Sequence, residues 1–423
     1  MILYLILLLH EPLEYVQAES VNYSNHQFFN VFCDLQNSRL FSADNDCVIL
    51  KEYKLYSKLL CDEKINTKQA GDCNVRREEN KIGSKEEDER RRRREVKRES
   101  MNPGFLDFSN RLFPGEYHRY AEIEKYLKKM AAKFPQFFSL EDLERTHENR
   151  SIYLVKIGTS RLGSETPTAL VDGGMHAREW ITPATALQLI FNLISVFKAD
   201  KDSCMDPLQS MDWYIIPLLN PDGYEYSHTS DRYWRKNMRP APLGSDCPGV
   251  DINRNFPLGY GLGADSNPCS EVYMGTEALS EPESKSLFNI VHRLNKTLVF
   301  YTSLHAFGQS WLMPYGYIAD RIPEYERFEW LAKQSFKQMD CRFGEQVPSR
   351  EWEVGGAAEI YYIAGGASDD WVYNITGAVS YTIELPDDGR SYAFELPASS
   401  VEEVSTDIWN ALRHLALNIL SGK

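Results

Sequence analysis

An excess of positive charge is absent from this sequence, in which 61 aspartates and glutamates outnumber 47 lysines and arginines and give a net charge of −14. Nucleic acid repels such a chain unless it carries a separate basic face, so we expect no nucleic-acid partner. The first apolar run, Ile2–Leu9, is much shorter than the about 20 residues that span a bilayer. We therefore expect no membrane span. No internal repeat emerges from the sequence either.

The same N-terminal run suits the apolar centre of a signal peptide. Val16 and Ala18 provide a small-residue cleavage pattern, which predicts a signal peptide over residues 1–18, although no Lys or Arg precedes the run. A buried strand is the alternative interpretation. Eight cysteines fit an oxidising route, as do four Asn-x-Ser/Thr sequons, at Asn22, Asn149, Asn295 and Asn374. We expect a secreted, extracellular protein.

Residues 76–111 begin with a stretch that has almost no apolar side chains and cannot form a core of its own. We interpret this segment as a charged linker. Its run Arg90–Arg94 and its dibasic pair Lys97-Arg98 would be cut readily by a trypsin-like or furin-like protease, and a plain linker is the alternative. Residues 19–75 would then be an N-terminal pro-region of unknown fold, in which four cysteines allow three pairings.

From about Leu112 the sequence has the alternation of a globular α/β domain, which we place at residues 112–423. Apolar runs predict strands, and apolar residues at helical spacing predict helices. The strands are expected at 152–157, 168–171, 213–219, 298–303 and 378–385, and helices at 120–134, from 182 and at 408–419. A turn over 220–223 would close the third strand. The order predicts a mixed, mainly parallel twisted sheet with helices on both faces.

Two polar side chains follow the second of these strands, in VDGGMHAREW, where His176 and Glu179 lie three residues apart. His305 ends another apolar strand, in YTSLHAFG. Ligands collect at the carboxyl ends of strands in such sheets, and a catalytic zinc takes three protein ligands with one position open. Each histidine alone is more often a hydrogen-bonded core or surface residue, so the three residues by themselves indicate a metal site only weakly.

The sequence from about residue 112 to the end resembles the metallocarboxypeptidases of the pancreatic A/B type. The resemblance is carried, in order, by GMHAREWITPAT, NPDGYEYSHTSDRYWRKN, GVDINRNFP, PCSEVYMG, LHAFGQSWLMPYGY, SDDWVYN and YTIELPDDGR. It implies one zinc ion bound by His176, Glu179 and His305, with water in the open position. It also implies an enzyme that acts on the C-termini of peptides and proteins, and we expect a monomer.

Roles for further residues follow from the same resemblance. Glu384 lies in the apolar stretch SYTIELP, where a carboxylate is costly without a function, and it matches the catalytic glutamate. Arg235 matches the arginine that stabilises the oxyanion. Asn253 and Arg254 match the pair that holds the terminal carboxylate of the substrate, a task to which a guanidinium group is suited.

Other matches concern the surroundings of this site. Tyr362 matches the mobile tyrosine that closes over substrate, and Arg178 and Arg232 match arginines along the binding groove. Asp251 would orient His176, because metal-bound histidines usually donate their second N–H group to a carboxylate or carbonyl. The resemblance also implies a disulfide, between Cys247 and Cys269, and leaves Cys204 and Cys341 without an assigned partner.

Specificity in this family depends on the base of the pocket for the terminal side chain. Asp369, in SDDW, stands where B-type enzymes carry an aspartate that pairs with Lys or Arg, whereas A-type enzymes have an apolar residue there. A buried carboxylate favours a cationic partner, so we expect a preference for C-terminal Lys or Arg. Gly316 resembles the A type, and Ala357 is larger than the glycine usual in B-type pockets.

Three alternatives stay open at this point. An A-type enzyme would act on aromatic or aliphatic C-termini. A catalytically silent binding protein could share the fold, but the three ligands, Glu384 and Arg235 are all present. A structural zinc domain needs four ligands, and no fourth Cys or His belongs to this set.

Overall fold

The computed structural model of the 423-residue chain describes residues 116–160, 164–198, 206–339, 352–386 and 392–423, together with strands at 26–32, 48–52, 57–62 and 74–81. The predicted signal peptide and protease-sensitive arginines lie outside the described residues, as do Cys204 and Cys341. The chain divides into two units, and each has its own sheet.

The smaller unit has a four-stranded sheet, which no pattern in residues 19–75 predicted. Its strands are β1 (His26–Phe32), β2 (Val48–Glu52), β3 (Ser57–Asp62) and β4 (Asn74–Lys81), in the antiparallel order β2-β3-β1-β4. Strand β4 corrects the boundary of the predicted linker, because residues 76–81 pair with β1 instead of leaving the sheet. Backbone hydrogen bonds suffice for an edge strand, and charged side chains are favoured there.

The larger unit is built on an eight-stranded mixed sheet in the order β11-β10-β12-β9-β7-β8-β6-β5. Strands β12, β9, β7 and β8 run parallel at its centre, and antiparallel pairs flank them. The strands are β5 (Phe138–Arg145), β6 (Ser151–Ile157), β7 (Thr168–Asp172), β8 (Asp212–Ile216), β9 (Leu298–Ala306), β10 (Ser310–Met313), β11 (Glu353–Gly356) and β12 (Val379–Leu385). This confirms the predicted α/β fold class.

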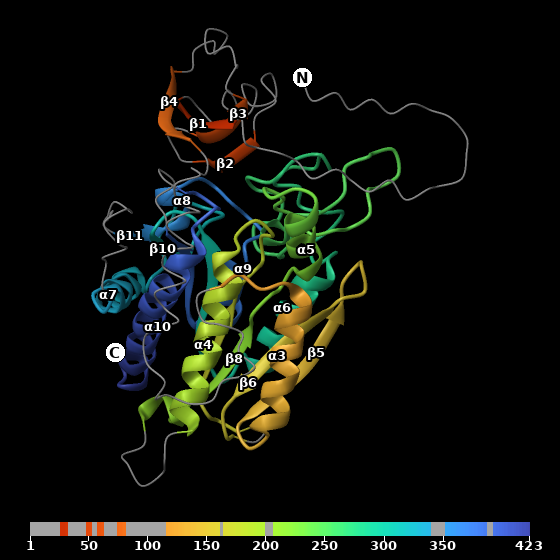
Figure 1. Cartoon of the computed structure of the whole chain (residues 1–423). Helices are drawn as coiled ribbons and strands as arrows, with labels where there is room; N and C mark the ends of the chain where they lie inside the picture. Colours follow the sequence, from red (N-terminus) through yellow and green to blue (C-terminus); the bar gives the residue numbers. More distant parts are fainter. Residues whose placement is uncertain are drawn as a thin grey trace, which may run out of the picture. The chain divides into compact units, whose positions relative to one another are not determined.

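Helices pack on both faces of this sheet (Figure 1). Helix α4 (Ile181–Lys198) contacts β6, β8 and β9 and lies beside α10 (Ala398–Leu420), which in turn contacts α7 (Tyr325–Phe336). The other helices are α3 (Tyr120–Lys133), α5 (Pro221–Thr229), α6 (Pro282–Leu294), α8 (Ala357–Ile360) and α9 (Ser368–Thr376). Of the described helices, α4 alone is long and apolar enough to cross a membrane, and 61% of it is buried. Its contacts are those of a core helix.

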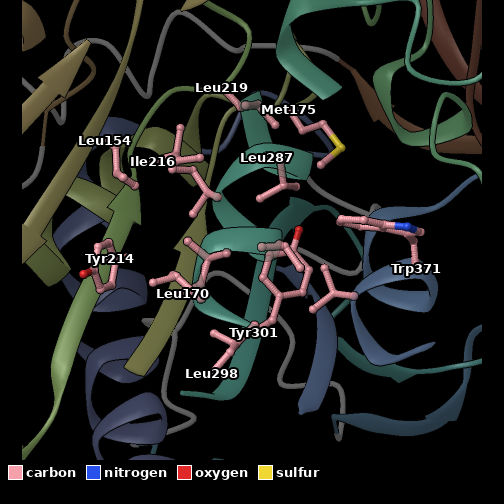
Figure 2. Close-up of a cluster of buried hydrophobic side chains, with 14 of the residues drawn as sticks. Leu154, Leu170, Met175, Tyr214, Ile216, Leu219, Leu287, Leu298, Tyr301 and Trp371 are labelled. Carbon is pink, nitrogen blue, oxygen red and sulfur yellow. The ribbon is translucent and has the colours of Figure 1, made fainter. Parts of the chain in front are cut away.

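A cluster of buried side chains joins β6, β7, β8 and β9 to α6 and α9 (Figure 2). The cluster includes Leu170, Tyr214 and Tyr301 from the sheet and Leu287 from α6, and Trp371 of α9 stacks on Phe288 at a ring distance of 5.0 Å. A fully buried aromatic ring contributes on the order of 2–3 kcal/mol. Trp371 thereby fixes the start of α9, which also carries Asp369.

The segment after β8 differs from its prediction. Strand β8 ends at Ile216, and Pro221 begins helix α5, where the sequence suggested a strand to Leu219 and a closing turn. Asn220 caps the helix, because its side-chain oxygen accepts a hydrogen bond from the Gly223 N–H at 2.9 Å. Asparagine before a proline is as typical of a helix N-terminus as of a turn.

Candidate active site

The carboxyl ends of the four parallel strands meet at one edge of the large sheet, and the predicted site residues gather there. His176 and Glu179 follow β7, and His305 is the penultimate residue of β9. Glu384 lies directly beside His305, because these two residues are register partners in the parallel pair β12 and β9. Neighbouring parallel strands therefore bring together residues that are distant in sequence.

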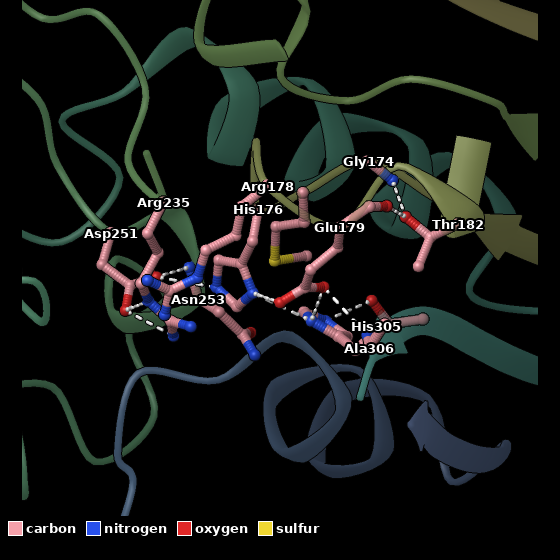
Figure 3. A network of polar contacts seen from close by, with 12 residues as sticks. Gly174, His176, Arg178, Glu179, Thr182, Arg235, Asp251, Asn253, His305 and Ala306 are labelled. Carbon is pink, nitrogen blue, oxygen red and sulfur yellow. Dashed lines mark hydrogen bonds and ion pairs between the residues drawn. The ribbon is translucent and has the colours of Figure 1, made fainter. Parts of the chain in front are cut away.

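Two glycines allow the chain to turn sharply between β7 and α4. Gly174 has a φ of +66°, and a Cβ atom there would lie 2.5 Å from the Leu218 side chain. A Cβ on Gly173 would lie 2.8 Å from the Thr182 carbonyl oxygen. Thr182 closes this turn, since its hydroxyl accepts from the Gly174 N–H and donates to the Glu179 carbonyl (Figure 3).

Ligand atoms of His176, Glu179 and His305 all lie within 4.8 Å of one another. His176 Nδ1 is 2.9 Å from Glu179 Oε1 and 3.0 Å from His305 Nδ1, and His305 Nδ1 is 3.2 Å from Glu179 Oε2. All three side chains are buried, and Figure 3 shows them pointing toward one another. The structure thus brings the three predicted ligands together.

The outer nitrogen of each histidine is held by a different partner. His176 Nε2 lies 3.0 Å from Asp251 Oδ1, and His305 Nε2 lies 3.0 Å from the Ser303 hydroxyl. Both ring nitrogens of His176 face carboxylate oxygens, and a neutral imidazole can donate to only one of them. A zinc ion bound at Nδ1 would leave the ring proton on Nε2, facing Asp251, and would take the lone pair of Nδ1. That lone pair faces the Glu179 carboxylate. Convergent acceptors of this kind repel one another unless a cation lies between them, and they suit a zinc ion.

Asp251 is fully buried and binds three groups at once. It accepts from His176 and from the Asn253 backbone N–H at 3.0 Å, and two nitrogens of Arg235 contact its Oδ2 at 3.0 and 2.8 Å. Burial alone would raise the pKa of Asp251, but Arg235 and His176 hold this pKa well below its usual range. Asp251 is therefore a permanent anion that fixes both the first histidine and Arg235.

Arg254 and Asn253 lie next to this group, on the short 3₁₀ helix Ile252–Arg254. Arg254 is 3% exposed, and its side chain donates to the Asn253 carbonyl at 2.9 Å and to the Tyr362 hydroxyl at 3.2 Å. Its Nε finds no partner among the described residues. A buried guanidinium group with an unused donor is arranged to receive an anion.

Comparison with known proteins decides the family. A family model described as zinc carboxypeptidase matches residues 123–411. The chain belongs to the zinc carboxypeptidase family. It is 32% identical over 302 residues to carboxypeptidase B of Astacus astacus, which covers 71% of this chain and 96% of that protein. Against carboxypeptidase A1 of Bos taurus it is 36% identical over 299 residues, which cover 69% and 68%.

Solved structures agree with this assignment. Carboxypeptidase A from Helicoverpa armigera matches with a TM-score of 0.78 at 25% identity, over 95% of this chain and 99% of that one. The chain is therefore a metallocarboxypeptidase, a peptide hydrolase, as its sequence motifs predicted. Both A-type and B-type enzymes are among its relatives, so family membership leaves its preferred C-terminal residue undecided.

The residues predicted to form the base of the specificity pocket lie at the start of α9. Asp369 is buried, and burial raises its pKa. Asp370 accepts hydrogen bonds from the Gly316 and Tyr317 backbone N–H groups at 2.8–2.9 Å, and burial together with Asp369 raises its pKa well above the usual range. Hydrogen bonds with backbone N–H groups lower both pKa values, and His305 lowers that of Asp369, but burial outweighs them.

The predicted groove arginines differ in their surroundings. Arg178 is buried, donates to Glu271 at 3.0 Å and to the Tyr233 carbonyl, and lies 4.5 Å from the Phe394 ring centroid. These contacts fix Arg178 inside the protein, so its predicted place along the groove stays a prediction. Arg232 is partly exposed in the loop after α5.

A disulfide joins Cys247 and Cys269, the pair that the family resemblance implied. It closes a loop of the segment that carries Asp251, Asn253 and Arg254. In the chain-entropy model such a link over about 20 residues stabilises the fold by about 3 kcal/mol. The disulfide therefore steadies the loop that supports the site.

Two supporting residues were missed by sequence reasoning, namely Ser303 and Asp172. Ser303 contacts His305, and Asp172 contacts Ser303. Ser303 lies two positions before His305, so strand alternation places both on the same face of the sheet and could have indicated it. Asp172 directly follows the strand predicted at 168–171, and no periodicity in the sequence pairs it with β9.

Proposed function

We propose that this member of the family is secreted as a zymogen and removes C-terminal Lys and Arg residues from peptides and proteins. The observation that carries the preference is the buried acidic pair Asp369 and Asp370, which forms no ion pair with a lysine or arginine of the described residues. Asp370 accepts hydrogen bonds from two backbone N–H groups, and burial raises the pKa of Asp369 although backbone hydrogen bonds lower it. We assign the counter-charge of a cationic substrate to Asp369.

A cationic substrate side chain supplies that charge. An ionised carboxylate in a buried pocket is strongly disfavoured without a partner, and an incoming ammonium or guanidinium group offsets this cost. An apolar side chain leaves Asp369 unpaired or protonated. Discrimination that depends on an unpaired buried polar group is larger than discrimination by apolar contact alone.

His176, Glu179 and His305 would hold the zinc ion through two Nδ1 atoms and a carboxylate. Zinc in such a site lowers the pKa of a bound water molecule and polarises a carbonyl group. The protein's part is to present unprotonated ligands, and Asp251 does this for His176 by keeping the proton on Nε2.

Glu384 acts as the general base in this proposal. Its position beside His305 in the β12–β9 pair places a carboxylate next to the metal ligands, where it takes a proton from water and passes it to the leaving amine. Arg235, held by Asp251, stabilises the charge that develops on the carbonyl oxygen. Each residue is connected to a predicted ligand: Glu384 lies beside His305, and Arg235 shares Asp251 with His176.

Arg254 and Asn253 bind the free carboxylate of the substrate. The unused Nε of Arg254 and its planar guanidinium group suit a two-point contact with a carboxylate. Tyr362, whose hydroxyl already contacts Arg254, covers the bound terminus. The carboxylate contact explains why the enzyme acts at chain ends and not within chains.

A preference for apolar C-termini is the second candidate, and Gly316 favours it. A Cβ atom on Gly316 would lie 3.5 Å from the Ala357 Cβ, so small residues line this part of the pocket as in A-type enzymes. Carboxypeptidases of the A type are also among the relatives. We give the charge of Asp369 more weight than the small size of Gly316 and Ala357, because an unpaired buried charge costs more free energy than a small gap in packing.

Secretion and zymogen activation are supported by sequence features alone. The apolar run before Ala18 supports a signal peptide, and the basic run Arg90–Arg94 supports cleavage by a trypsin-like or furin-like protease. Both features lie outside the described residues. Culture medium from cells that express the full-length chain would be tested for a product that begins after residue 18.

One assay tests the peptidase proposal. The full-length chain, before and after limited trypsin treatment, is incubated with peptides that end in Lys, Arg, Phe or Leu, with and without a zinc chelator. We expect chelator-sensitive release of Lys and Arg that is restored by added zinc. Faster release of Phe than of Arg would overturn the pocket assignment. No release from any peptide would favour a silent binding protein on this fold.

A further inference from the structure

Asp172, the last residue of β7, is a fully buried carboxylate that connects two functional parts of the protein. Its Oδ1 accepts a hydrogen bond from the Ser303 hydroxyl at 2.9 Å, and its Oδ2 accepts from the Tyr301 hydroxyl at 2.5 Å. Tyr301 also contacts the Ser368 hydroxyl at 2.9 Å, and Ser368 is the first residue of α9. Asp172 therefore links β9 to the helix that carries Asp369.

The Ser303 hydroxyl has only one proton, and its direction determines the state of His305. Because Ser303 donates this proton to Asp172, its oxygen can only accept from His305 Nε2 at 3.0 Å. His305 must then carry its proton on Nε2. In the neutral ring, Nδ1 of His305 is then left with a lone pair. This atom lies 3.0 Å from His176 Nδ1, where the ligand atoms of His176, Glu179 and His305 converge.

We infer that Asp172 is a positioning residue for zinc, which acts through Ser303 by fixing the tautomer and ring orientation of His305. The inference rests on the proposed zinc site. It makes the two histidines different in kind, since His176 is held directly by the carboxylate of Asp251 and His305 by a carboxylate one hydroxyl away.

The position of the three side chains on one strand face supports this assignment. Residues 301, 303 and 305 of β9 point to the same face of the sheet, and β7 runs beside them with Asp172 in register with Ser303. Thr302 is equally buried between them but points to the opposite face, and its hydroxyl has no hydrogen-bond partner among the described residues. Thr302 offers a matched control.

The test measures zinc affinity, so it does not depend on peptidase activity. Ser303→Ala and Thr302→Val are made in the full-length chain, and the zinc dissociation constant is measured by competition with a chromophoric chelator. Loss of an outer partner of a metal ligand typically weakens binding by about 10- to 100-fold, which we expect for Ser303→Ala. Thr302→Val removes a hydroxyl from the same strand and should leave the constant unchanged.

A double-mutant cycle separates action through Ser303 from a general structural role. Asp172→Asn alone should weaken zinc binding, because its amide can turn the Ser303 proton toward His305 and favour the wrong tautomer. In the Ser303→Ala background the same change should have no further effect on zinc affinity, because the hydroxyl through which Asp172 acts on His305 is absent. Additive losses would show that Asp172 acts on the fold alone and would overturn the inference.

The outcomes distinguish this inference from the proposed function. A wild-type chain that binds zinc while Ser303→Ala binds it equally well refutes the role of Ser303 and Asp172 and leaves the zinc site standing. A wild-type chain that binds no zinc refutes both. Thermal unfolding of each zinc-free chain checks folding, and if Asp172→Asn does not fold, Ser303→Ala against Thr302→Val still decides.

Discussion

Two regions of this protein contain a buried aspartate, and the charges around the two aspartates differ. At the metal centre, Asp251 is surrounded by His176, Arg235 and a backbone N–H group, and its pKa lies well below the usual range. In the proposed specificity pocket, burial raises the pKa of Asp369, which forms no ion pair with a lysine or arginine of the described residues. Equal burial therefore leads to opposite protonation preferences.

The difference shows which region the protein completes by itself. The anion of Asp251 is balanced before any substrate arrives, so the orientation of His176 and Arg235 is part of the fold. In the proposed function, the charge of Asp369 is balanced only when a cationic substrate side chain enters the pocket. In this interpretation the metal centre is preorganised, and the pocket uses the substrate as its missing partner.

Glu384 gives the largest expected effect, because it is the proposed general base and lies beside His305 in the β12–β9 pair. Replacing Glu384 by Gln removes the general base and keeps the shape of the side chain, so kcat on a peptide ending in Arg should fall by about 10²- to 10⁴-fold. The zinc dissociation constant should not change, since Glu384 is not one of the three ligands. Steady-state kinetics and chelator competition on the same preparations check both statements. Zinc loss in this variant would contradict the separation of base and ligands.

Asp369 tests the pocket side of the comparison. Breaking a buried charge pair typically costs 3–5 kcal/mol, so Asp369→Ile should lower kcat/KM for a C-terminal Arg peptide by about a hundredfold or more. The same variant should release C-terminal Phe faster than Arg. Ratios of kcat/KM for the two peptides measure this change.

Asp369→Asn is the matched control for that experiment. It keeps the size of the side chain and removes the charge, so it should weaken the Arg preference without creating a Phe preference. An Arg preference that survives both substitutions would show that another group reads the substrate cation. Zinc affinity should be unchanged in both variants if the two regions are independent.

The sequence could predict the metal centre better than its supports. His176 and His305 follow apolar runs, and strand ends at one sheet edge are the expected place for ligands. Asp172 and Ser303 are single polar residues within or beside apolar strands, and their contact depends on the register of β7 with β9, which no local pattern specifies. The tertiary pairing of strands therefore decides what the sequence leaves open.

Errors in the predicted elements have a similar origin. Residues 76–81 were assigned to a linker because they are charged, yet they form the edge strand β4. Strand β5 was missed for the same reason, since FSLEDLER is largely polar and pairs only with β6. Edge strands carry charge because one side faces solvent. Asp370 was also missed as a group that holds the pocket backbone at Gly316.

Asp251 tests the metal-centre side of the comparison. Asp251→Asn removes the anion that fixes His176, so the zinc dissociation constant should rise by about 10- to 100-fold. Asp222→Asn is a matched control, because Asp222 is equally buried and binds Arg150 and Thr146 away from the ligands. Chelator competition on both variants checks the prediction. Equal losses in the two variants would mean that zinc affinity follows general stability.

A third group of buried acids, Glu281 and Glu283 at the start of α6, extends the comparison. Here one of the two carboxyl groups is neutralised by a proton and not by a cationic side chain. Both carboxyls accept from the Asn237 amide, at 2.8 and 2.9 Å, but Glu281 also binds His147 and Arg239. Burial and Glu281 raise the pKa of Glu283 to about 8. The protein therefore compensates Glu281 with cations and Glu283 with a proton.

This arrangement predicts a pH-dependent stability that Glu283→Gln removes. Between the unfolded pKa of 4.5 and the folded pKa of about 8, the folded chain holds a proton that the unfolded chain has lost. Wild-type stability from this group is therefore fully present below pH 4.5 and falls as pH rises toward 8, at a rate on the order of 1 kcal/mol per pH unit. The Gln variant stays neutral, so its free energy of unfolding should rise relative to that of the wild type from pH 5 to pH 8.

Denaturant unfolding at several pH values measures this difference in free energy. The exposed Glu277→Gln is a control that removes a charge without changing a buried group. A difference between wild type and Glu283→Gln that stays constant with pH would show that Glu283 is ionised and balanced by its surroundings, as Asp251 is.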